Sequence, residues 1–153
     1  SYVGKAGEAL VEARLLALRA NVARPAVDER CIDLLAFTVT DRVRVVPIQV
    51  KTASQTGYTL QRSWFETPDL ALVWVWRLHG VPEFFIFGGI EDAEAALGNS
   101  ADTMSWRDRG GYSVSGNVSP ARLERLAPFQ NAWHKILTPL GIDANIQAAI
   151  DVD

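Results

Sequence analysis

The sequence feature that most constrains the fold is a pair of apolar, β-branched runs separated by a short polar segment. Ile32 to Val39 and Val43 to Lys51 each have the composition of a strand, and Thr40-Asp41-Arg42 between them is typical of a turn. The two runs therefore predict a hairpin. Pro47 cannot donate a ladder hydrogen bond, so we expect an edge position or a bulge there.

A helix is predicted before this hairpin, from about Gly4 to Ala20, because apolar residues recur at positions three and four apart. The apolar positions form two neighbouring stripes: Ala6, Ala9, Leu10, Ala13, Leu16, Ala17 and Ala20, and beside them Val11, Leu15, Leu18 and Val22. A helix that is apolar around so much of its circumference should be largely buried. Its polar strip carries Lys5, Glu8, Glu12 and Arg19.

The remainder of the chain predicts more strands and then helices. The expected strands are Tyr58–Gln61, Leu70–Arg77, Glu83–Phe87 (paired with the preceding run through His79-Gly80) and Tyr112–Ser115. The expected helices are Glu91–Leu97 and a longer one that starts at Ser119-Pro120, breaks or kinks at Pro128 and ends near Leu137. This order predicts one α/β (mixed α+β) domain over residues 1–153, with helices packed on a central sheet.

Composition excludes several classes of site. Cys31 is the single cysteine, so the chain can form no internal disulfide and no cysteine cluster for zinc, and we expect its side chain to be buried. The two histidines, His79 and His134, have no metal-ligand spacing and are interpreted as structural or surface residues. The chain has no apolar stretch of membrane-spanning length and no secretory signal, which favours a cytoplasmic protein in a reducing compartment.

The charge of the chain is unevenly distributed. The net charge is −3, yet residues 1–62 hold nine Lys or Arg against six Asp or Glu, a balance of +3, whereas residues 63–153 have a balance of −6. A basic excess in one part of a chain favours a polyanionic partner such as DNA.

The same basic part contains the residues best suited to catalysis. Gln49 and Lys51 are two apart on one strand and share a face, whereas Val46, Ile48 and Val50 point the other way, into the expected core. Asp33 opens the preceding strand, and a hairpin centred near Asp41 would bring it level with Gln49 and Lys51. The polar strip of the first helix could supply Glu8 and, less surely, Glu12.

These residue types suit phosphodiester hydrolysis. The reaction needs neutralised phosphate charge, a positioned water and a stabilised leaving oxygen. Mg²⁺ (or Mn²⁺) takes oxygen ligands, which Asp33, the Gln49 amide and the Val50 carbonyl offer, with Glu8 nearby. Lys51 could orient or deprotonate the attacking water.

In these residues the chain resembles the PD-(D/E)XK nuclease superfamily, which includes restriction endonucleases and Holliday-junction resolvases. The resemblance covers residues 4–54: Gly7-Glu8, then Cys31-Ile32-Asp33-Leu34-Leu35, then Ile48-Gln49-Val50-Lys51-Thr52. It implies a restriction-endonuclease-like mixed sheet flanked by helices. It also implies active-site roles for Glu8, Asp33, Gln49 and Lys51.

The chain departs from the family pattern at two positions. Gln49 stands where Asp or Glu is usual, and Ile32 stands where proline usually precedes the aspartate. Two functions are favoured: a Mg²⁺-dependent endonuclease acting on DNA, and a non-catalytic module of the same fold that binds nucleic acid or a protein. An enzyme that acts on another substrate through the same metal ligands is a less favoured third. A homodimer is expected in the first case.

The two functions differ in a single respect, catalysis. The endonuclease cleaves DNA with bound metal, whereas the non-catalytic module keeps the fold and the binding surface without cleavage. Gln49 decides between them, because a neutral amide can donate an oxygen to a metal ion but brings no negative charge.

Aromatic and arginine residues outside this segment offer further candidates. Trp74 and Trp76 share one face of a strand, where they could stack on unpaired bases or cover a core or a subunit interface, and we favour the interface. Arg107 and Arg109 lie beside Gly110-Gly111, where an ordinary solvated loop is favoured over a phosphate-contacting one.

Overall fold

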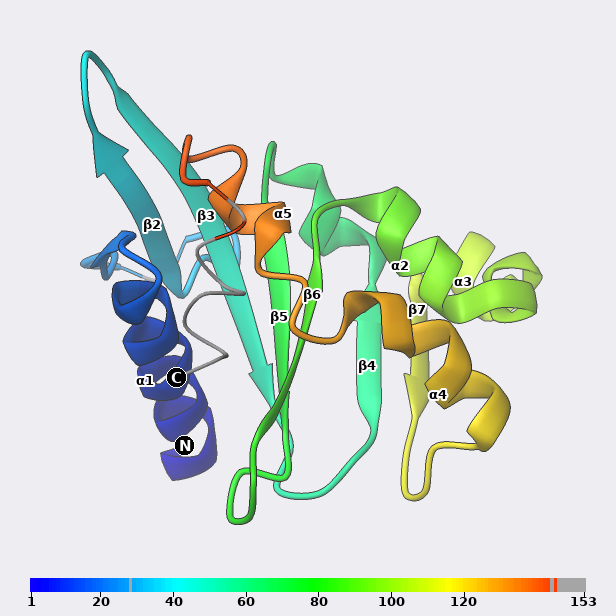
Figure 1. The fold of residues 1–153 in the computed structure, drawn as a ribbon. Coiled ribbons are helices and arrows are strands. Elements are labelled where there is room, and N and C mark those ends of the chain that lie inside the picture. The colour runs from blue at the N-terminus through cyan, green and yellow to red at the C-terminus, as the bar shows by residue number, and fades with distance from the viewer. Residues whose placement is uncertain (28, 144, 146–153) are drawn as a thin grey trace.

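A five-stranded mixed sheet forms the centre of the computed structural model, which describes residues 1–27, 29–143 and 145 (Figure 1). Its strands lie in the order β1-β2-β3-β5-β6; β3 and β5 are parallel, and the other neighbours are antiparallel. The strands are β1 Asn21–Ala23, β2 Leu34–Val39, β3 Val43–Thr52, β5 Ala71–Trp76 and β6 Glu83–Phe87. The predicted mixed α/β fold with helices against a central sheet is confirmed.

The predicted hairpin is the β2–β3 pair. Val39 pairs with Val43 beside the turn, and the ladder continues without interruption to Leu34 and Ile48. Pro47 pairs with Leu35 in an unbroken register, so there is no bulge at this position. The pairing of β3 with β5 begins only at Ile48, so Pro47 lies where β3 has β2 as its one strand neighbour, as an edge position requires.

The predicted N-terminal helix is α1, Tyr2–Ala17, which begins where the Ser1 side chain accepts a hydrogen bond from the Gly4 N–H. The prediction that α1 is largely buried is wrong. Only the narrower stripe is buried, at Val11 and Leu15, and most of the alanines of the broader stripe are exposed. Alanine has the highest helix propensity and little apolar surface, so this stripe reflects helix formation more than packing.

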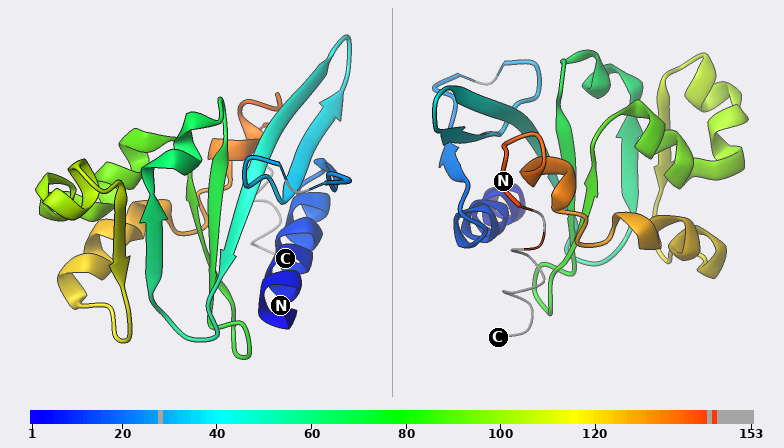
Figure 2. Two further views of the ribbon diagram at one scale, coloured as in Figure 1. Left: turned by 180° about the vertical axis from the view of Figure 1, so that it is seen from behind. Right: turned by 45° about the horizontal axis from the view of Figure 1, so that its top comes forward.

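The two faces of the sheet are covered differently (Figures 1 and 2). One face packs on α1 and α5 (His134–Leu137) through a mostly aliphatic core. The other face packs on a two-stranded sheet of β4 and β7, on helices and on short 3-10 turns, through an aromatic core. The elements of that second layer are β4 Tyr58–Gln61, η1 Arg62–Glu66, α2 Ile90–Leu97, η2 Gly98–Asp102, α3 Met104–Arg107, β7 Gly111–Val114, α4 Pro120–Leu126 and η3 Ala127–Phe129.

The predicted last helix is broken. α4 ends at Leu126, a 3-10 turn contains Pro128, and α5 starts again at His134. Proline lacks an N–H and its ring opposes a continuous helix, so the predicted break is confirmed at this residue. β1 was not predicted, because three residues are too few to show a strand pattern.

Two expectations about burial are wrong. Trp74 and Trp76 do not lie at a subunit interface: they are 1% and 2% exposed and belong to the aromatic core of this chain. Cys31 is exposed and has a positive φ of 60°, in the irregular segment before β2. Both histidines are exposed, as predicted for surface residues.

No helix in the part of the chain that the structure describes combines the length and the apolar character needed to cross a membrane.

Candidate active site

Asp33 is bound to the end of β3 by two hydrogen bonds. Its carboxylate Oδ2 accepts a hydrogen bond from the Val50 N–H at 2.7 Å, and its own N–H donates to the Ile48 carbonyl at 2.8 Å. The hairpin register therefore places Asp33 level with Gln49-Val50-Lys51, as predicted from the position of the turn. A carboxylate that accepts a short backbone hydrogen bond is fixed in orientation.

Gln49 is one of two buried polar residues among those the structure describes, with 2% of its surface exposed. Within the described residues its Oε1 is buried and accepts no hydrogen bond. An unsatisfied buried acceptor costs on the order of 1–3 kcal/mol. The side chain thus presents an amide oxygen that nothing in the described protein satisfies.

Lys51 lies on the same face of β3 as Gln49, whereas Val46, Ile48 and Val50 belong to the aliphatic core on the opposite face, as predicted. The Lys51 ammonium Nζ lies 5.0 Å from the centroid of the Trp64 ring. Lys51 is exposed and Trp64 is buried. A cation over an indole face is attracted by the ring, which limits the positions it occupies.

Glu8 and Glu12 of α1 are both ion-paired with one arginine. Arg24 donates from Nη1 to Glu8 Oε2 and from Nη2 to Glu12 Oε2, each at 2.8 Å, and Lys5 Nζ lies 3.3 Å from Glu8 Oε2. The hydrogen bond with Glu12, followed by that with Glu8, raises the pKa of Arg24 against the opposing effect of burial. Glu8 is therefore ion-paired with two basic side chains, and its own side chain is 12% exposed.

The structure brings the predicted residues together in two groups. Glu8 and Asp33 line one cavity of about 390 Å³, together with Arg24 and Lys5. Lys51 lines a second cavity of about 370 Å³, on the face of the sheet opposite α1. The end of β3 connects the two, because Val50 binds Asp33 and the next residue is Lys51.

The oxygen donors at this end of the sheet suit a magnesium ion by chemical type. Mg²⁺ binds carboxylate and amide oxygens and keeps several waters. The Asp33 carboxylate and the unsatisfied Gln49 Oε1 supply both kinds of oxygen. Among the described residues, no group of three or more His, Cys, Asp or Glu side chains is placed to hold a metal, so the set is low in negative charge.

Two residues of the site were not identified from the sequence. Arg24 neutralises both glutamates of α1, and Trp64 lies beneath the Lys51 ammonium. Neither belongs to a motif, and both are brought to the site by contacts between segments distant in the sequence. Glu8 and Glu12 are four residues apart on α1 and could share one basic partner, but Arg19, Arg24 and Arg30 all follow the helix, and nothing in the sequence singles out Arg24.

Comparison with known proteins gives a structural likeness alone. No protein-family model matches the chain, and no curated protein sequence does. Among solved structures, a bacterial homing endonuclease (I-Ssp6803I) has a similar fold, with a TM-score of 0.52 and 15% sequence identity over 98% of this chain and 96% of that one. The chain therefore shares the overall fold of that structure.

Proposed function

We propose that this protein is a metal-dependent endonuclease that hydrolyses DNA phosphodiester bonds. The observation that carries the proposal is the 2.7 Å hydrogen bond between Asp33 and Val50, which joins the candidate carboxylate to the Gln49-Val50-Lys51 strand end in a nuclease-like fold. The order of Asp33 and Gln49-Val50-Lys51 in the sequence supports the same function, and the fold likeness to a homing endonuclease is in accord with it.

The proposed metal ligands are oxygen atoms of Asp33, Gln49 and the Val50 backbone carbonyl, with Glu8 nearby. When bound, Mg²⁺ or Mn²⁺ would supply charge neutralisation at the phosphate and a water of lowered pKa. Asp33 would bind the metal ion in a fixed orientation, because its carboxylate already accepts a hydrogen bond from the Val50 N–H. Glu8 would become a metal ligand only after its 2.8 Å ion pair with Arg24 breaks.

Lys51 is the residue proposed to hold the attacking water and to neutralise charge on the phosphate. Its ammonium is exposed and is placed next to Val50 by the strand. A positive group there would neutralise charge that develops on the phosphate oxygens and would hold a water by hydrogen bonding. Trp64 would limit where the ammonium can lie, since the ring is buried and 5.0 Å away.

DNA is the proposed partner because of where the basic side chains lie. The basic excess of the chain is in residues 1–62, the same part that holds Asp33 and Lys51. Arg42 and Arg44 lie near the tip of the β2–β3 hairpin, which extends beyond the other strands (Figure 1). Contacts between these arginines and DNA phosphates would give binding that weakens as the salt concentration rises.

A homodimer is the proposed oligomeric state. Three valines close to the hairpin tip, Val39, Val43 and Val45, are 63%, 61% and 47% exposed, which is unusual for neighbouring apolar residues on paired strands. Sedimentation velocity over a range of protein concentrations tests this point. A dimer that Val43→Lys dissociates supports it, and a monomer at all concentrations opposes it.

Cleavage of supercoiled plasmid, hairpin and branched DNA in Mg²⁺ or Mn²⁺ tests the proposed function. Wild-type protein should cleave at least one substrate, and Asp33→Asn and Lys51→Ala should each lower the rate by about 100-fold or more. Asp102→Asn and Lys135→Ala are matched controls, since both residues form surface ion pairs away from β3, and they should keep wild-type rates. Cleavage that survives Lys51→Ala would contradict the proposal.

A second candidate function is supported by a specific observation. Glu8 is neutralised by Arg24 and Lys5, and Gln49 carries no charge, so these two proposed ligands bring little negative charge to a metal ion. These features favour a nuclease-fold module that binds DNA or a protein without cleaving. Calorimetry with Mn²⁺ separates the two functions: heat of binding that Asp33→Asn abolishes supports the enzyme, and DNA binding without Mn²⁺ binding supports the module.

A further inference from the structure

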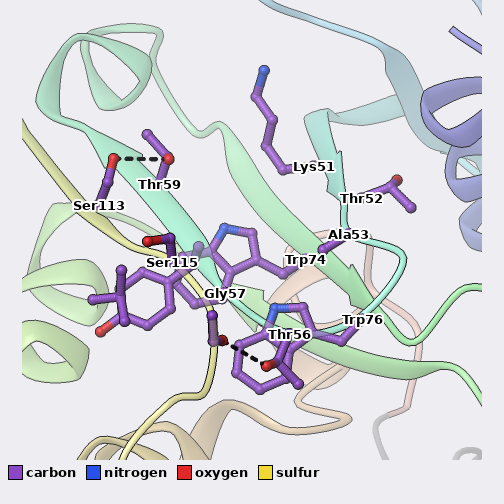
Figure 3. A pocket seen from close by; sticks show the side chains of 13 residues that line it. Lys51, Thr52, Ala53, Thr56, Gly57, Thr59, Trp74, Trp76, Ser113 and Ser115 are labelled. Atoms are coloured by element: carbon purple, nitrogen blue, oxygen red, sulfur yellow. Dashed lines mark hydrogen bonds between the residues drawn. The ribbon is translucent and has the colours of Figure 1, made fainter.

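The polar side chains that line the cavity beside Lys51 are hydroxyl groups, two indole N–H groups and an ammonium. It measures about 370 Å³ and lies between the end of β3, the floor formed by β5 and the loops at one end of the β4–β7 sheet (Figure 3). No acidic residue is among the described residues that line it. Lys51 brings a positive charge, and Trp74 and Trp76 bring indole N–H groups.

The two indole N–H groups are buried and have no acceptor among the described residues. Both side chains are at least nine-tenths buried, at 1% and 2% exposure. In the view of Figure 3, the nitrogen atom of each ring lies on the ring edge nearer Lys51. A buried donor without an acceptor costs about 1–3 kcal/mol, which a ligand oxygen in this cavity would offset.

Three of the hydroxyl groups around the cavity are engaged with each other or with the backbone. Thr56 Oγ1 donates to the Gly116 carbonyl at 3.0 Å, and Thr59 Oγ1 lies 2.9 Å from Ser113 Oγ. These bonds tie β4 and the segment before it to the β7 side of the cavity. The indole N–H groups and the Lys51 ammonium therefore remain as donors for a ligand, beside the Ser115 hydroxyl.

Base stacking on the tryptophans does not fit this cavity. The Trp74 ring is stacked on Tyr58, with centroids 4.6 Å apart and planes at 19°, and Phe87 packs on it at 4.6 Å. Trp76 packs against Phe85 at 4.7 Å. With ring faces covered by neighbouring aromatic side chains, the indoles can meet a ligand only through their N–H edges.

We propose that this cavity binds a phosphate monoester of nucleotide size, with Lys51, Trp74 and Trp76 as donors to the phosphate oxygens. A phosphate has acceptor oxygens alone and a negative charge, which matches two N–H donors and an ammonium with no carboxylate nearby. The volume falls within the range of small-ligand pockets. The proposal rests on the proposed function for its source of ligand, either a free nucleotide or the phosphorylated end of a cleaved strand.

Indole ¹H–¹⁵N NMR spectra of the uniformly labelled protein test this proposal directly. Trp74→Phe and Trp76→Phe assign the two signals, and thymidine 5′-monophosphate, thymidine and a 5′-phosphorylated oligothymidylate are the probes. The monophosphate should shift both signals, and thymidine should bind about tenfold more weakly or not at all, because it lacks the charged acceptor. The Trp106 signal is the internal control, since its N–H already faces Glu94 Oε2 at 3.4 Å.

The outcomes separate the sources of the phosphate and the two proposals. Shifts with the monophosphate show that a free nucleotide suffices, and shifts with the phosphorylated oligonucleotide alone show a strand end; both support the cavity. Unmoved Trp74 and Trp76 signals with every phosphate probe would overturn it, as would equal shifts with thymidine. Phosphate binding without DNA cleavage would contradict the endonuclease function alone. DNA cleavage without these signal shifts would contradict the phosphate-binding cavity alone.

Discussion

The two faces of the central sheet are built from different chemistry. The face under α1 is aliphatic and brings carboxylates to its margin, where Arg24 holds Glu8 and Glu12. The opposite face is aromatic, and its cavity presents the Lys51 ammonium and two indole N–H groups. β3 belongs to both faces, since Val50 points to one and Lys51 to the other. The end of β3 thus lies between a margin that carries ion-paired carboxylates and a cavity that presents hydrogen-bond donors.

Trp74→Ala should give the largest effect, because it removes the central ring of the aromatic face. Trp74 contacts Tyr58, Trp76, Phe85 and Phe87 and is 1% exposed. We expect a loss of about 3–5 kcal/mol in the free energy of unfolding, measured by chemical denaturation. Val73→Ala, the neighbour that faces α1, is the matched variant and should cost clearly less. Equal losses would show that the two faces contribute alike.

Gly7→Ala should give the next effect, on the α1 face. A β-carbon at Gly7 would overlap the Thr52 side chain, so α1 would have to move away from β3. We expect a loss of about 1–3 kcal/mol in the free energy of unfolding. Gly4→Ala on the same helix is the control, since its β-carbon would meet only the Ser1 hydroxyl at 3.1 Å. A Gly7→Ala protein as stable as wild type would refute this close contact.

Gln49→Glu tests how the charge at the end of β3 affects metal binding and stability. The change adds a carboxylate beside Asp33, where the amide oxygen has no described partner. Mn²⁺ affinity by calorimetry should rise by about tenfold, equivalent to roughly 1.4 kcal/mol. Without metal the variant should be less stable than wild type at neutral pH, since a buried charge is costly. Gln49→Met removes the oxygen at similar size and should show neither the gain in Mn²⁺ affinity nor the loss of stability from a buried charge. Unchanged Mn²⁺ affinity in Gln49→Glu would contradict a metal site at Gln49.

Tyr112→Phe should give the smallest effect, in the second layer behind the aromatic face. A side-chain hydrogen bond with Ser100, and then one from Arg122, lowers the pKa of Tyr112 below its ordinary value of 10.0. Since the folded-state pKa is the lower one, Tyr112 stabilises the fold fully above pH 10 and loses that contribution as the pH falls through the lowered pKa. The stability difference between wild type and Tyr112→Phe should therefore grow as the pH rises toward 10. A difference that shrinks with rising pH would contradict this direction.

The sequence predicted the central part of the fold because that part depends on local patterns. The hairpin, the β5–β6 pair and the break at Pro128 each follow from runs of apolar residues or from one proline. Asp33 was placed beside Val50 because a hairpin fixes its own register. The burial of α1 was misjudged because alanine favours a helix whether or not it is buried.

The rest of the site depends on contacts that no local pattern encodes. Arg24 reaches Glu8 and Glu12 across 16 and 12 residues of chain, and Trp64 meets Lys51 through a separate layer of the fold. The β4–β7 pair joins segments about fifty residues apart, so the cavity between it and β5 has no sequence signature. Trp74 and Trp76 were assigned to an interface because the layer that buries them was not foreseen.

The most direct test of the proposed metal site is a crystal structure of the protein soaked in Mn²⁺, with anomalous scattering used to locate the ion. We predict one Mn²⁺ at coordination distance from the Asp33 carboxylate, with the Gln49 amide oxygen or the Val50 carbonyl as a further ligand. An ordered Mn²⁺ bound elsewhere, or no ion at Asp33 under conditions where the protein cleaves DNA, would contradict it.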